Sequence, residues 1–420
     1  MIEKVDALIV GAGVIGSSVA MHLAKMGMQK IRVIDLDLEG ALSSSELNAG
    51  GVRATWVQPI NIEMSKQSID YFAEMATQVG YRPCGYLWLN SEQKMKAALQ
   101  ARERQLSHGW PVEVWDLAEL KRRVPFIDKT DAIAGCIYGP RDGLINPNLL
   151  KNHFRNEARA LGVVFDDRTW LQEVTFSQEA GQRIHAKAAR FETALSHETK
   201  LEVVSSSSSS GSDSSGILGT KPIEYQAHSI VNCAGPWAAK VASLLGYQCP
   251  TYPVRRQVCI FDCRDVDLTS YGMIVDVSGV YFHAEATNGL AGFANPSEPR
   301  GINYDYDGEG FFTEIIWPAL YERSTRFERL KHVTGWAGLY DVSPDECAVI
   351  GEVDYGGVKG NQGIFEAHSF SGHGVMHSYS AGRALAEKII KGRYESLEDV
   401  DLLSGSRFEK GKPIYENLVI

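Results

Sequence analysis

A glycine-rich turn between an apolar strand and a helix is the feature that most constrains the fold of this chain. Residues 5–35 read VDALIVGAGVIGSSVAMHLAKMGMQKIRVID, which is a strand, the pattern Gly11-x-Gly13-x-x-Gly16, a helix and a second strand ending in Asp35. This order and spacing are those of the βαβ unit that binds dinucleotides. The pattern therefore predicts a parallel sheet of the Rossmann type that begins with these residues.

Each part of the turn has its own predicted role. Gly11 permits the tight turn, Gly13 lets the backbone approach a pyrophosphate, and Gly16 lets the helix pack closely on the strand. The helix N-terminus offers N–H groups and partial positive charge to the phosphates, while Asp35 accepts hydrogen bonds from ribose hydroxyls. An ordinary buried βαβ unit without a ligand is the alternative.

Charge and hydropathy exclude two classes of partner. The chain has 420 residues and a formal net charge of -10, which repels phosphate backbones, so we expect no nucleic-acid partner. No uninterrupted apolar run reaches the length that spans a bilayer, so we predict no membrane span. A chain of this length predicts two domains or interleaved halves.

Cysteine and histidine positions bear on compartment and metals. The seven cysteines are an odd number and include no CxxC pair, which is typical of reduced thiols in an intracellular protein. We expect a cytoplasmic location, or the mitochondrial matrix if the source is eukaryotic. His373 and His377 are spaced for one helix face but lack an HExxH context, so we predict no metal.

Strand, glycine-rich turn and helix recur far from the first βαβ unit. SIVNCAGPWAAKVASLLG (229–246) and GIFEAHSFSGHGVMHSYSAGRALAEKIIKG (363–392) both show this order, and alternating segments such as PVRRQVCIFDC and GVYFHAE predict an antiparallel sheet between them. We predict an α/β (α+β) fold, with a dinucleotide-binding Rossmann domain interleaved with a mainly antiparallel β-sheet substrate domain. The predicted dinucleotide-binding domain comprises residues 1–83, 146–250 and 335–420, and the substrate domain comprises residues 84–145 and 251–334.

A serine-rich tract, SSSSSSGSDSSG (205–216), is the one low-complexity segment. Serine offers little apolar surface to offset the backbone entropy of ordering, about 1–2 kcal/mol per residue. We predict a mobile hairpin insertion flanked by strands, KLEVV (200–204) before it and IEYQAHSIVNCAG (223–235) after it.

The recurrence of glycine turns favours FAD over a nicotinamide cofactor. A nicotinamide enzyme usually completes its binding site within one contiguous domain. Two distant helix N-termini can instead converge on one cofactor, one on the pyrophosphate and the other on the edge of an isoalloxazine that becomes anionic on reduction. We predict FAD, so the domain of residues 1–83, 146–250 and 335–420 is predicted to be a glutathione-reductase-like FAD-binding Rossmann domain. A nicotinamide dehydrogenase remains the weaker alternative.

Five motifs in order resemble the D-amino-acid oxidase (DAO) superfamily of FAD oxidoreductases, which includes sarcosine oxidase, dimethylglycine dehydrogenase and glycine oxidase. They are VGAGVIGSSVAMHLA, SSSELNAGGVR, VNCAGPWAAKVASLLG, GWAGLYDVSPDECAVIG and FSGHGVMHSYSAGRALAEKI, and they span essentially the whole chain. GGVRATWVQPINIEMS, DVSGVYFHAE and KPIYENLVI further resemble a mitochondrial branch of the family that assists assembly of respiratory complex I. The chain lacks an Arg-rich leader, which favours a bacterial cytoplasmic relative.

The resemblance implies a set of FAD-binding residues drawn from all five motifs. They are Gly11, Gly13, Val14, Ile15, Gly16, Asp35, Leu36, Ser44, Ser45, Asn48, Ala49, Gly50, Gly51, Val174, Ala234, Gly235, Trp237, Gly338, Gly372, His373, Gly374, Val375 and Met376.

Four residues are candidates for the catalytic site. The resemblance places Arg53 where sarcosine oxidases bind a substrate carboxylate, and a buried anion needs such a cation; a surface ion pair is the alternative. Tyr340 matches a tyrosine of the substrate pocket, or it is a core aromatic. His283 follows a strand at a position that commonly faces the flavin, or it is satisfied within the sheet. His373 lies in SGHG, where its backbone is the part expected to matter.

Departures from the family pattern lead to further expectations. Met376 replaces a lysine that helps to hold the substrate carboxylate, and Ala291 replaces a lysine that promotes reaction with oxygen. We therefore expect slow oxygen use. Gly338 and Asn48 stand where relatives attach flavin through cysteine and histidine, so we expect the FAD to be non-covalent.

Two functions from different classes follow. The leading hypothesis is an FAD-dependent dehydrogenase that takes hydride from the α-carbon of an amine or N-substituted amino acid, with a small-molecule substrate. The second is a flavoprotein that acts mainly as an assembly or binding factor, of the type associated with respiratory complex I. The sequence identifies neither the electron acceptor nor the oligomeric state.

Overall fold

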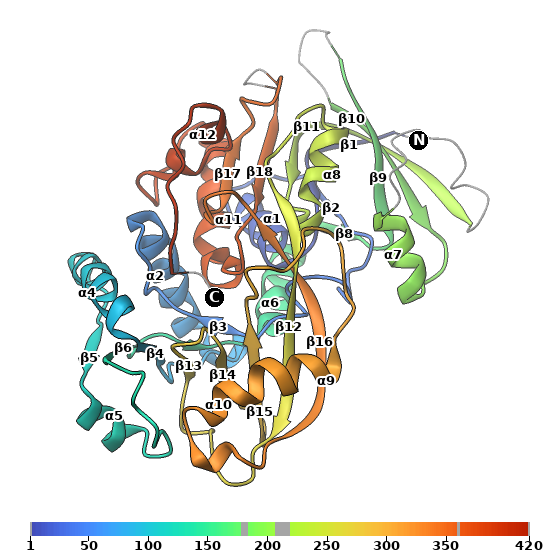
Figure 1. The fold of residues 1–420 in the computed structure, drawn as a ribbon. Coiled ribbons are helices and arrows are strands. Elements are labelled where there is room, and N and C mark those ends of the chain that lie inside the picture. Colours follow the sequence, from blue (N-terminus) through green and yellow to red (C-terminus); the bar gives the residue numbers. More distant parts are fainter. Residues whose placement is uncertain (1, 178–183, 206–218, 359–361, 419–420) are drawn as a thin grey trace. The chain divides into compact units, whose positions relative to one another are not determined.

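The computed structural model describes residues 2–177, 184–205, 219–358 and 362–418, and the chain forms two compact units (Figure 1). Unit 1 comprises Met1–Glu46, Asn148–Pro253 and Tyr340–Tyr415, and unit 2 comprises Leu47–Pro147, Val254–Leu339 and Glu416–Ile420. Both units are discontinuous in sequence, so each closes its core with segments that lie far apart along the chain.

Unit 1 is built on a sheet whose central strands are parallel. The strand order is β17-β18-β11-β1-β2-β8, and β10 and β9 extend it from β11. Strands β18, β11, β1, β2 and β8 pair in parallel, whereas β17, β10 and β9 pair antiparallel. The strands are β1 (Ile2–Val10), β2 (Ile31–Ile34), β8 (Val164–Asp166), β9 (Thr169–Phe176), β10 (Ile184–Phe191), β11 (Thr220–Asn232), β17 (Val349–Glu352) and β18 (Ile364–His368).

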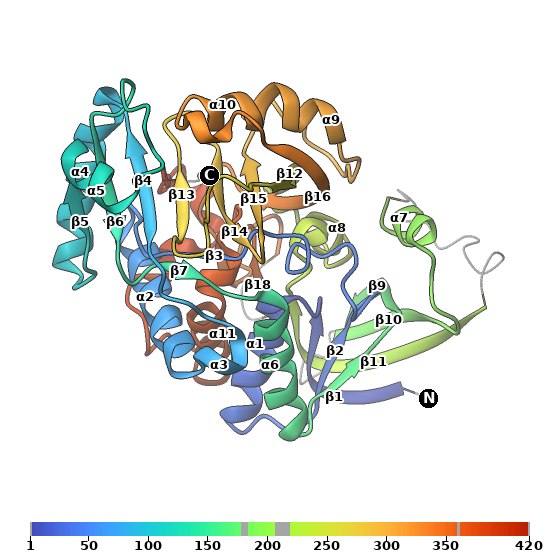
Figure 2. The ribbon, with the colours of Figure 1, turned by 90° about the horizontal axis from the view of Figure 1, so that it is seen from below.

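The helices of unit 1 are α1 (Val14–Lys25), α6 (Pro147–Ala160), α7 (His197–Ser205), α8 (Ala238–Leu244), α11 (Gly374–Lys391) and α12 (Ser406–Glu409). Helices α11, α1 and α6 follow one another in a row (Figure 2). Gly382 permits the close approach of α11 to α1, because a Cβ there would lie 2.2 Å from the Ser18 Oγ. Helix α8 adds Val241 and Ala242 to a core with β1 and β11, and Leu245, directly after the helix, belongs to the same core.

Unit 2 contains a second, mainly antiparallel sheet in the order β16-β12-β15-β14-β13-β4-β6-β5. Its strands are β4 (Tyr86–Asn90), β5 (Glu113–Trp115), β6 (Gly135–Gly139), β12 (Tyr252–Asp262), β13 (Met273–Val275), β14 (Tyr281–Glu285), β15 (Asn288–Phe293) and β16 (Lys331–Val342). A short ribbon pairs β3 (Gly51–Val52) with β7 (Gly143–Leu144).

The helices of unit 2 are α2 (Pro59–Glu74), α3 (Ala76–Val79), α4 (Glu92–Ser107), α5 (Leu117–Arg123), α9 (Gly308–Gly310) and α10 (Trp317–Tyr321). The segment from α9 to α10 lies along the strands β15 and β12 (Figure 2). It packs Phe311, Phe312, Ile316 and Leu320 against the sheet, which forms the main core of the unit.

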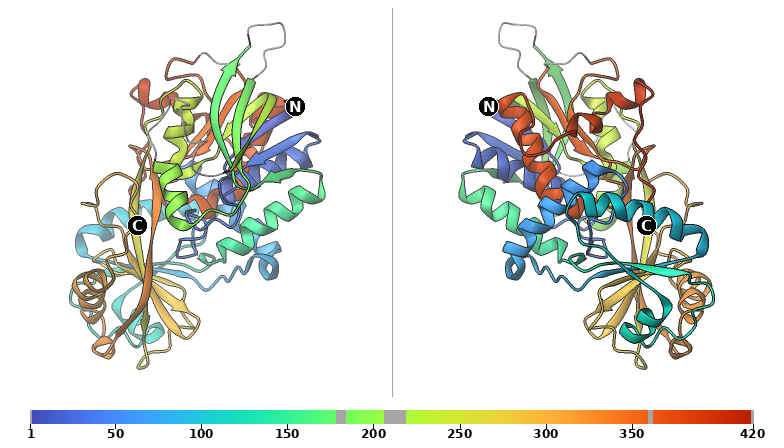
Figure 3. Two further views of the ribbon diagram at one scale, coloured as in Figure 1. Left: turned by 90° about the vertical axis from the view of Figure 1, so that its right-hand side faces the viewer. Right: turned by 90° about the vertical axis from the view of Figure 1, so that its left-hand side faces the viewer.

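The α/β class, the first βαβ unit and the antiparallel second sheet are confirmed, and three details differ from prediction. Residues 47–83, 335–339 and 416–418, predicted in the FAD-binding domain, belong to unit 2. Residues 47–83 do so because Gly51 pairs with Leu144 and α2 packs beside α4. Residues 200–204, predicted as a strand, lie in helix α7. The antiparallel partner of β11 is instead β10, at residues 184–191 (green strands in Figure 3).

The serine-rich tract falls almost wholly outside the described residues, since only Ser205 belongs to them. The strands on either side of this connection, β10 and β11, pair antiparallel as a hairpin. In the part of the chain that the structure describes, no helix is both long and apolar enough to cross a membrane.

Candidate functional site

Three turns of unit 1 open at one edge of its parallel sheet. Strands β1, β11 and β18 are parallel neighbours, and they end at Val10, Asn232 and His368. The turns that follow contain Gly11, Ala234–Gly235 and 369–372. Because the carboxyl ends of parallel strands share an edge, and ligands of open α/β sheets bind outside that edge, the two distant glycine turns face one common site. Helices α1 and α11 begin there and lie side by side.

The first glycine turn fits a close approach of a pyrophosphate. Gly11 has a φ of 103°, and a Cβ there would lie 2.3 Å from the carbonyl oxygen of Cys233. A Cβ on Gly16 would lie 2.0 Å from the carbonyl oxygen of Gly11. Packing within the unit thus requires glycine at positions 11 and 16. Gly13 leaves the start of α1 without a side chain that would obstruct a ligand.

The N-terminus of α1 suits an anion. Its first turn, which includes Val14 and Ile15, has no acidic residue and no side-chain cap from Gly13. The backbone N–H of Val14 donates to the Ser45 Oγ at 3.0 Å, so the predicted residue Ser45 lies directly at this helix end, next to Ser44. The N–H groups and the dipole of a helix N-terminus stabilise a phosphate at such a position.

Asp35 lies at the end of β2, beside the glycine turn. Its Oδ2 accepts from the N–H of Ala12 at 2.6 Å, and its Oδ1 accepts from Asp37 at 2.9 Å. Burial raises the pKa of Asp35, although these hydrogen bonds and the charge of Arg155 oppose the change. Each carboxylate oxygen can accept a further hydrogen bond, as the predicted contact with ribose requires.

Arg155 is a site residue that the sequence did not reveal. It projects from α6 and donates to the carbonyl oxygens of Ala12 and, at 2.6 Å, Leu38, with its Nε 3.3 Å from the Ser17 Oγ. It therefore ties the glycine turn to the segment after β2. The sequence indicates its role only weakly: in KNHFRNEAR (151–159), Arg155 is a basic residue on the apolar face of an amphipathic helix.

Other predicted cofactor residues lie in unit 1 as well. Leu36 and Trp237 belong to one apolar cluster with Trp170. Val174 lies in β9 and packs against the core around β1 and β11. Gly235, with a φ of 52°, opens the turn after β11.

The second glycine turn has unusual backbone geometry. Ser369, Ser371 and Gly372 have φ values of 58°, 49° and 96°. A Cβ on Gly372 would lie 2.2 Å from the Tyr340 ring, so the structure brings these two predicted residues into contact. His373 then precedes α11, whose first turn, Gly374, Val375 and the buried Met376, contains no acidic residue.

In unit 2, a predicted turn is held by its own side chain and by a histidine. The Asn48 Oδ1 accepts from the N–H of Gly50 at 2.6 Å, and Gly50 has a φ of 69°. The Nε2 of His283 lies 2.9 Å from the carbonyl oxygen of Ala49. Burial lowers the pKa of His283, although its contacts with the carbonyl oxygens of Ala284 and Ala49 oppose the change. The histidine thus supports the 48–51 turn.

Arg53 follows that turn and is buried, with 2 % of its surface exposed. Its Nη1 donates to the carbonyl oxygen of Thr55 at 2.8 Å, and its Nη2 donates to that of Leu418. The guanidinium carbon lies 3.5 Å from the ring centroid of Trp56 and 4.8 Å from that of Trp88. Arg53 is therefore not a residue of a surface ion pair. Aromatic stacking and planar donors are what arginine offers at a recognition site.

Asp142 lies behind the Arg53 segment. Its Oδ1 accepts from the N–H of Ala54 at 2.9 Å and from the Trp110 Nε1 at 3.0 Å. Burial raises the pKa of this carboxyl to about 7, although the hydrogen bond from Ala54 and the charge of Arg53 oppose the change.

The predicted catalytic residues fall into two pairs. Arg53 and His283 belong to unit 2, whereas Tyr340 and His373 belong to unit 1. The two remaining predicted cofactor residues, Gly51 and Gly338, lie in unit 2, and a Cβ on Gly338 would lie 2.7 Å from the carbonyl oxygen of Leu47. These individual roles stay predictions.

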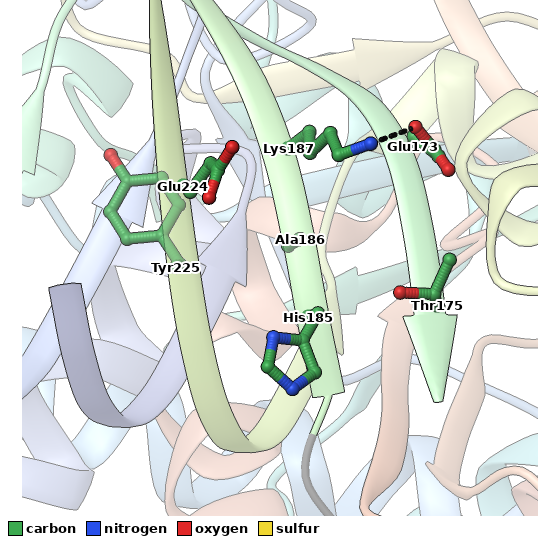
Figure 4. Close-up of a pocket in the computed structure, with 7 residues that line it drawn as sticks. All are labelled: Glu173, Thr175, His185, Ala186, Lys187, Glu224 and Tyr225. Carbon is green, nitrogen blue, oxygen red and sulfur yellow. Dashed lines mark hydrogen bonds and ion pairs between the residues drawn. The ribbon is translucent and has the colours of Figure 1, made fainter. Parts of the chain in front are cut away.

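A shallow hollow on strands β9, β10 and β11 is not this site (Figure 4). It contains Glu173 and Lys187, which pair with each other at 2.8 Å, and His185 beside them. None of the predicted cofactor or catalytic residues lines it. Among the described residues no group of three or more histidine, cysteine or acidic side chains could hold a metal ion.

The fold and the glycine turns define an FAD-dependent oxidoreductase. The family model described as DAO, FAD dependent oxidoreductase, matches residues 6–388. The chain belongs to this family, FAD is its cofactor, and the predicted resemblance is confirmed.

Relatives match over nearly the whole chain. The FAD-dependent oxidoreductase domain-containing protein 1 of Xenopus laevis is 30 % identical over 459 residues, which cover 100 % of this chain and 85 % of that protein. Human mitochondrial dimethylglycine dehydrogenase is 22 % identical over 97 % of this chain and 45 % of its own length. Among solved structures, L-proline dehydrogenase from P. horikoshii has a TM-score of 0.80 at 21 % identity and covers 99 % of this chain and 100 % of its own. Glycine oxidase from Geobacillus kaustophilus has a TM-score of 0.75 at 19 % identity, with coverage of 96 % and 99 %.

Proposed function

We propose that this protein is a dehydrogenase of an amine or N-substituted amino acid that carries a carboxylate, with Arg53 as the carboxylate-binding residue. The supporting observation is the buried guanidinium of Arg53 among Trp56, Tyr86 and Trp88. The bound FAD supplies the hydride acceptor at N5. The names of the relatives, which include dehydrogenases and oxidases of proline, glycine and dimethylglycine, agree with this substrate class.

The residues of this chain bind and orient the substrate in the proposal. A carboxylate is a stronger acceptor for a guanidinium than a neutral carbonyl, so a substrate carboxylate takes the place of the Leu418 carbonyl oxygen at Nη2 of Arg53. The rings of Trp56 and Trp88 exclude water around that contact. Tyr340 donates a hydrogen bond to the substrate.

A panel of amines and amino acids tests this function. Anaerobic addition of a true substrate bleaches the flavin absorbance, and Arg53→Lys raises KM by about tenfold or more, because lysine loses the planar pair of donors. Arg141→Lys is the matched control, since Arg141 also lies over a ring, that of Trp110, at 4.6 Å in the same unit. If no member of the panel bleaches the flavin, the proposal fails.

We further propose that oxygen is a poor electron acceptor. Ala291 is completely buried in β15, and Met376 is 6 % exposed in the first turn of α11. Neither position offers the cation that would stabilise superoxide-like charge beside a flavin. Reduced protein should reoxidise slowly in air and rapidly with an artificial acceptor, and rapid reoxidation in air would contradict this.

Ala291 and Met376 also favour a second function, a flavoprotein that acts mainly as an assembly or binding factor, because two cationic residues of the enzyme site are missing. In that case FAD stabilises the fold, and respiratory-chain subunits co-purify with the protein. Arg53→Ala would then leave the biological function normal, whereas the dehydrogenase requires Arg53.

A further inference from the structure

A buried polar network lies immediately before the 369–372 turn of unit 1. It joins Glu366 and His368, at the end of β18, to Asp341 in β16, and all three are at most 7 % exposed. The Glu366 Oε2 lies 3.0 Å from the His368 Nε2 and accepts from the hydroxyls of Tyr247 at 2.9 Å and Tyr355 at 3.0 Å.

This network holds the turn at several atoms. The N–H of Ser369 donates to the Asp341 Oδ2 at 2.5 Å, and the N–H of Ser371 donates to the Asp341 carbonyl oxygen at 2.9 Å. The His368 Nδ1 lies 2.8 Å from the Ser369 Oγ. The hydroxyl of Thr251 also donates to the Asp341 carboxylate.

The ionisable groups of the network influence one another. Burial alone would lower the pKa of His368, but the hydrogen bond with Glu366 and the charges of Glu366 and Asp341 raise it above its ordinary value. Burial raises the pKa of Asp341, and the charge of His368 opposes that change. Ionisable groups that are buried together and share hydrogen bonds cost less than the same groups buried alone.

The backbone of the turn explains why such support is needed. Ser369 and Ser371 are both in the left-handed region, with φ values of 58° and 49°. A non-glycine residue in a sparsely populated conformation costs about 1–3 kcal/mol and persists only where its surroundings over-determine it. The Asp341 carboxylate and carbonyl oxygen provide two such restraints, one on each serine.

We propose that Asp341 and His368 are positioning residues for the cofactor. They hold the 369–372 turn in its strained conformation and so fix the start of α11 where the flavin ring binds. They act through the turn, and neither needs to contact the flavin.

The test compares two buried carboxylates of the same segment. Asp341→Asn removes a charge that restrains the turn, whereas Asp345→Asn removes one that binds Arg407 at 2.8 Å and holds the N–H of Ile414. Titration of each apoprotein with FAD should show about tenfold weaker binding for Asp341→Asn and less than about twofold change for Asp345→Asn. The visible circular dichroism of the bound flavin should change only in Asp341→Asn.

A second substitution separates strain from general destabilisation. Glycine adopts the left-handed region at little cost, so Ser371→Gly should restore most of the FAD affinity of Asp341→Asn. Equal losses of affinity in the two asparagine variants, or no rescue by glycine, would overturn the proposal. If Asp341→Asn does not fold, His368→Gln, which keeps a hydrogen bond to Glu366, serves in the same comparison. Neither readout needs a substrate, so the outcome is independent of amine oxidation.

Discussion

At the first glycine turn, the space beside Gly11 is too small for a single additional carbon atom. Gly11 and Gly27 both have φ near 100°, at 103° and 98°. A Cβ on Gly11 would lie 2.3 Å from the carbonyl oxygen of Cys233, whereas a Cβ on Gly27 would meet nothing within 4 Å. The two positions therefore share a backbone requirement and differ only in the space beside them.

This pair gives a matched test of the cofactor site. Both Gly11→Ala and Gly27→Ala add the conformational cost of an unfavourable φ, about 1–3 kcal/mol. Only Gly11→Ala also displaces the turn that follows β1, so we expect FAD binding at least about tenfold weaker for this variant and near normal for Gly27→Ala. The ratio of flavin to protein absorbance after purification measures the difference. Equal flavin content in both variants would contradict the assignment of Gly11 to the cofactor site.

A residue-scale pH effect follows from Asp142. Its folded pKa is about 7, above the ordinary value of 3.8, because burial outweighs the hydrogen bond from Ala54. Between these two values the folded state binds more protons than the unfolded state. The stability contribution is therefore complete below pH 3.8 and is lost as pH rises through 7, by at most about 1.4 kcal/mol per pH unit.

Asp142→Asn should remove this dependence. The asparagine Oδ1 can still accept from Ala54 and Trp110, but it does not titrate. Denaturant unfolding between pH 4.5 and pH 7.5 should show that the wild type loses free energy of unfolding relative to the variant as pH rises. Parallel curves would show that Asp142 is charged in the folded protein throughout this range.

At the scale of elements, a segment from the far end of the sequence closes the start of α2. The Glu416 carboxylate, 1 % exposed, accepts from the N–H groups of Val57 and Gln58 and from the Asn61 Nδ2, all at 3.0–3.1 Å. It thus satisfies donors at a helix N-terminus with a negative charge. The carbonyl oxygen of Leu418 then reaches Arg53.

Glu416→Gln should destabilise this arrangement. The amide accepts on one oxygen only and brings two donors toward N–H groups, so we expect a loss of about 1–3 kcal/mol in the free energy of unfolding. Glu409→Gln is the control, because Glu409 is exposed and accepts one hydrogen bond, from Gly356. Chemical denaturation of both variants measures the difference, and equal stability would show that Glu416 is not an anchor of α2.

Elements whose pattern is local were predictable from sequence, and contacts between distant segments were not. The first βαβ unit, α11 and the strand pair β14 and β15 follow from glycine positions and alternating residues. Residues 200–204 of α7 were predicted as a strand because Val203 and Val204 favour strands, and local propensity alone cannot reveal the surroundings that decide the outcome. The hydrogen bonds between Asp341 and the 369–372 turn produce no periodic pattern in the sequence, so the sequence did not predict that Asp341 supports the turn.

For the whole molecule, the decisive arrangement is that both glycine turns belong to one unit. Strands β1 and β18 flank β11 in parallel, so the turns after them share an edge although they lie at opposite ends of the sequence. That convergence was predictable from repeated strand, turn and helix patterns. The assignment of 47–83 to unit 2 was not, because it depends on the pairing of Gly51 with Leu144.

Removal of FAD should therefore affect the two units unequally. We expect acid precipitation to release all the yellow colour, because Gly338 has no side-chain atom that could form a covalent link to the flavin. A side chain at position 338 would also collide with Leu47.

A ligand that binds only the folded state stabilises it by about 2.7 kcal/mol at one hundred times its Kd. Apoprotein should thus melt at a lower temperature and recover on addition of FAD.

Hydrogen exchange can locate that loss. In the apoprotein, exchange should rise most in residues 11–20 of unit 1 and in the turn and helix start at 369–380, because these segments lose the ligand that completes their hydrogen bonding. Strands β5 and β6 of unit 2 belong to a separate sheet with its own core, so their exchange should change little. A uniform increase over both units would mean that FAD stabilises the chain as one cooperative body, and protection confined to unit 2 would contradict the location of the cofactor between the two glycine turns.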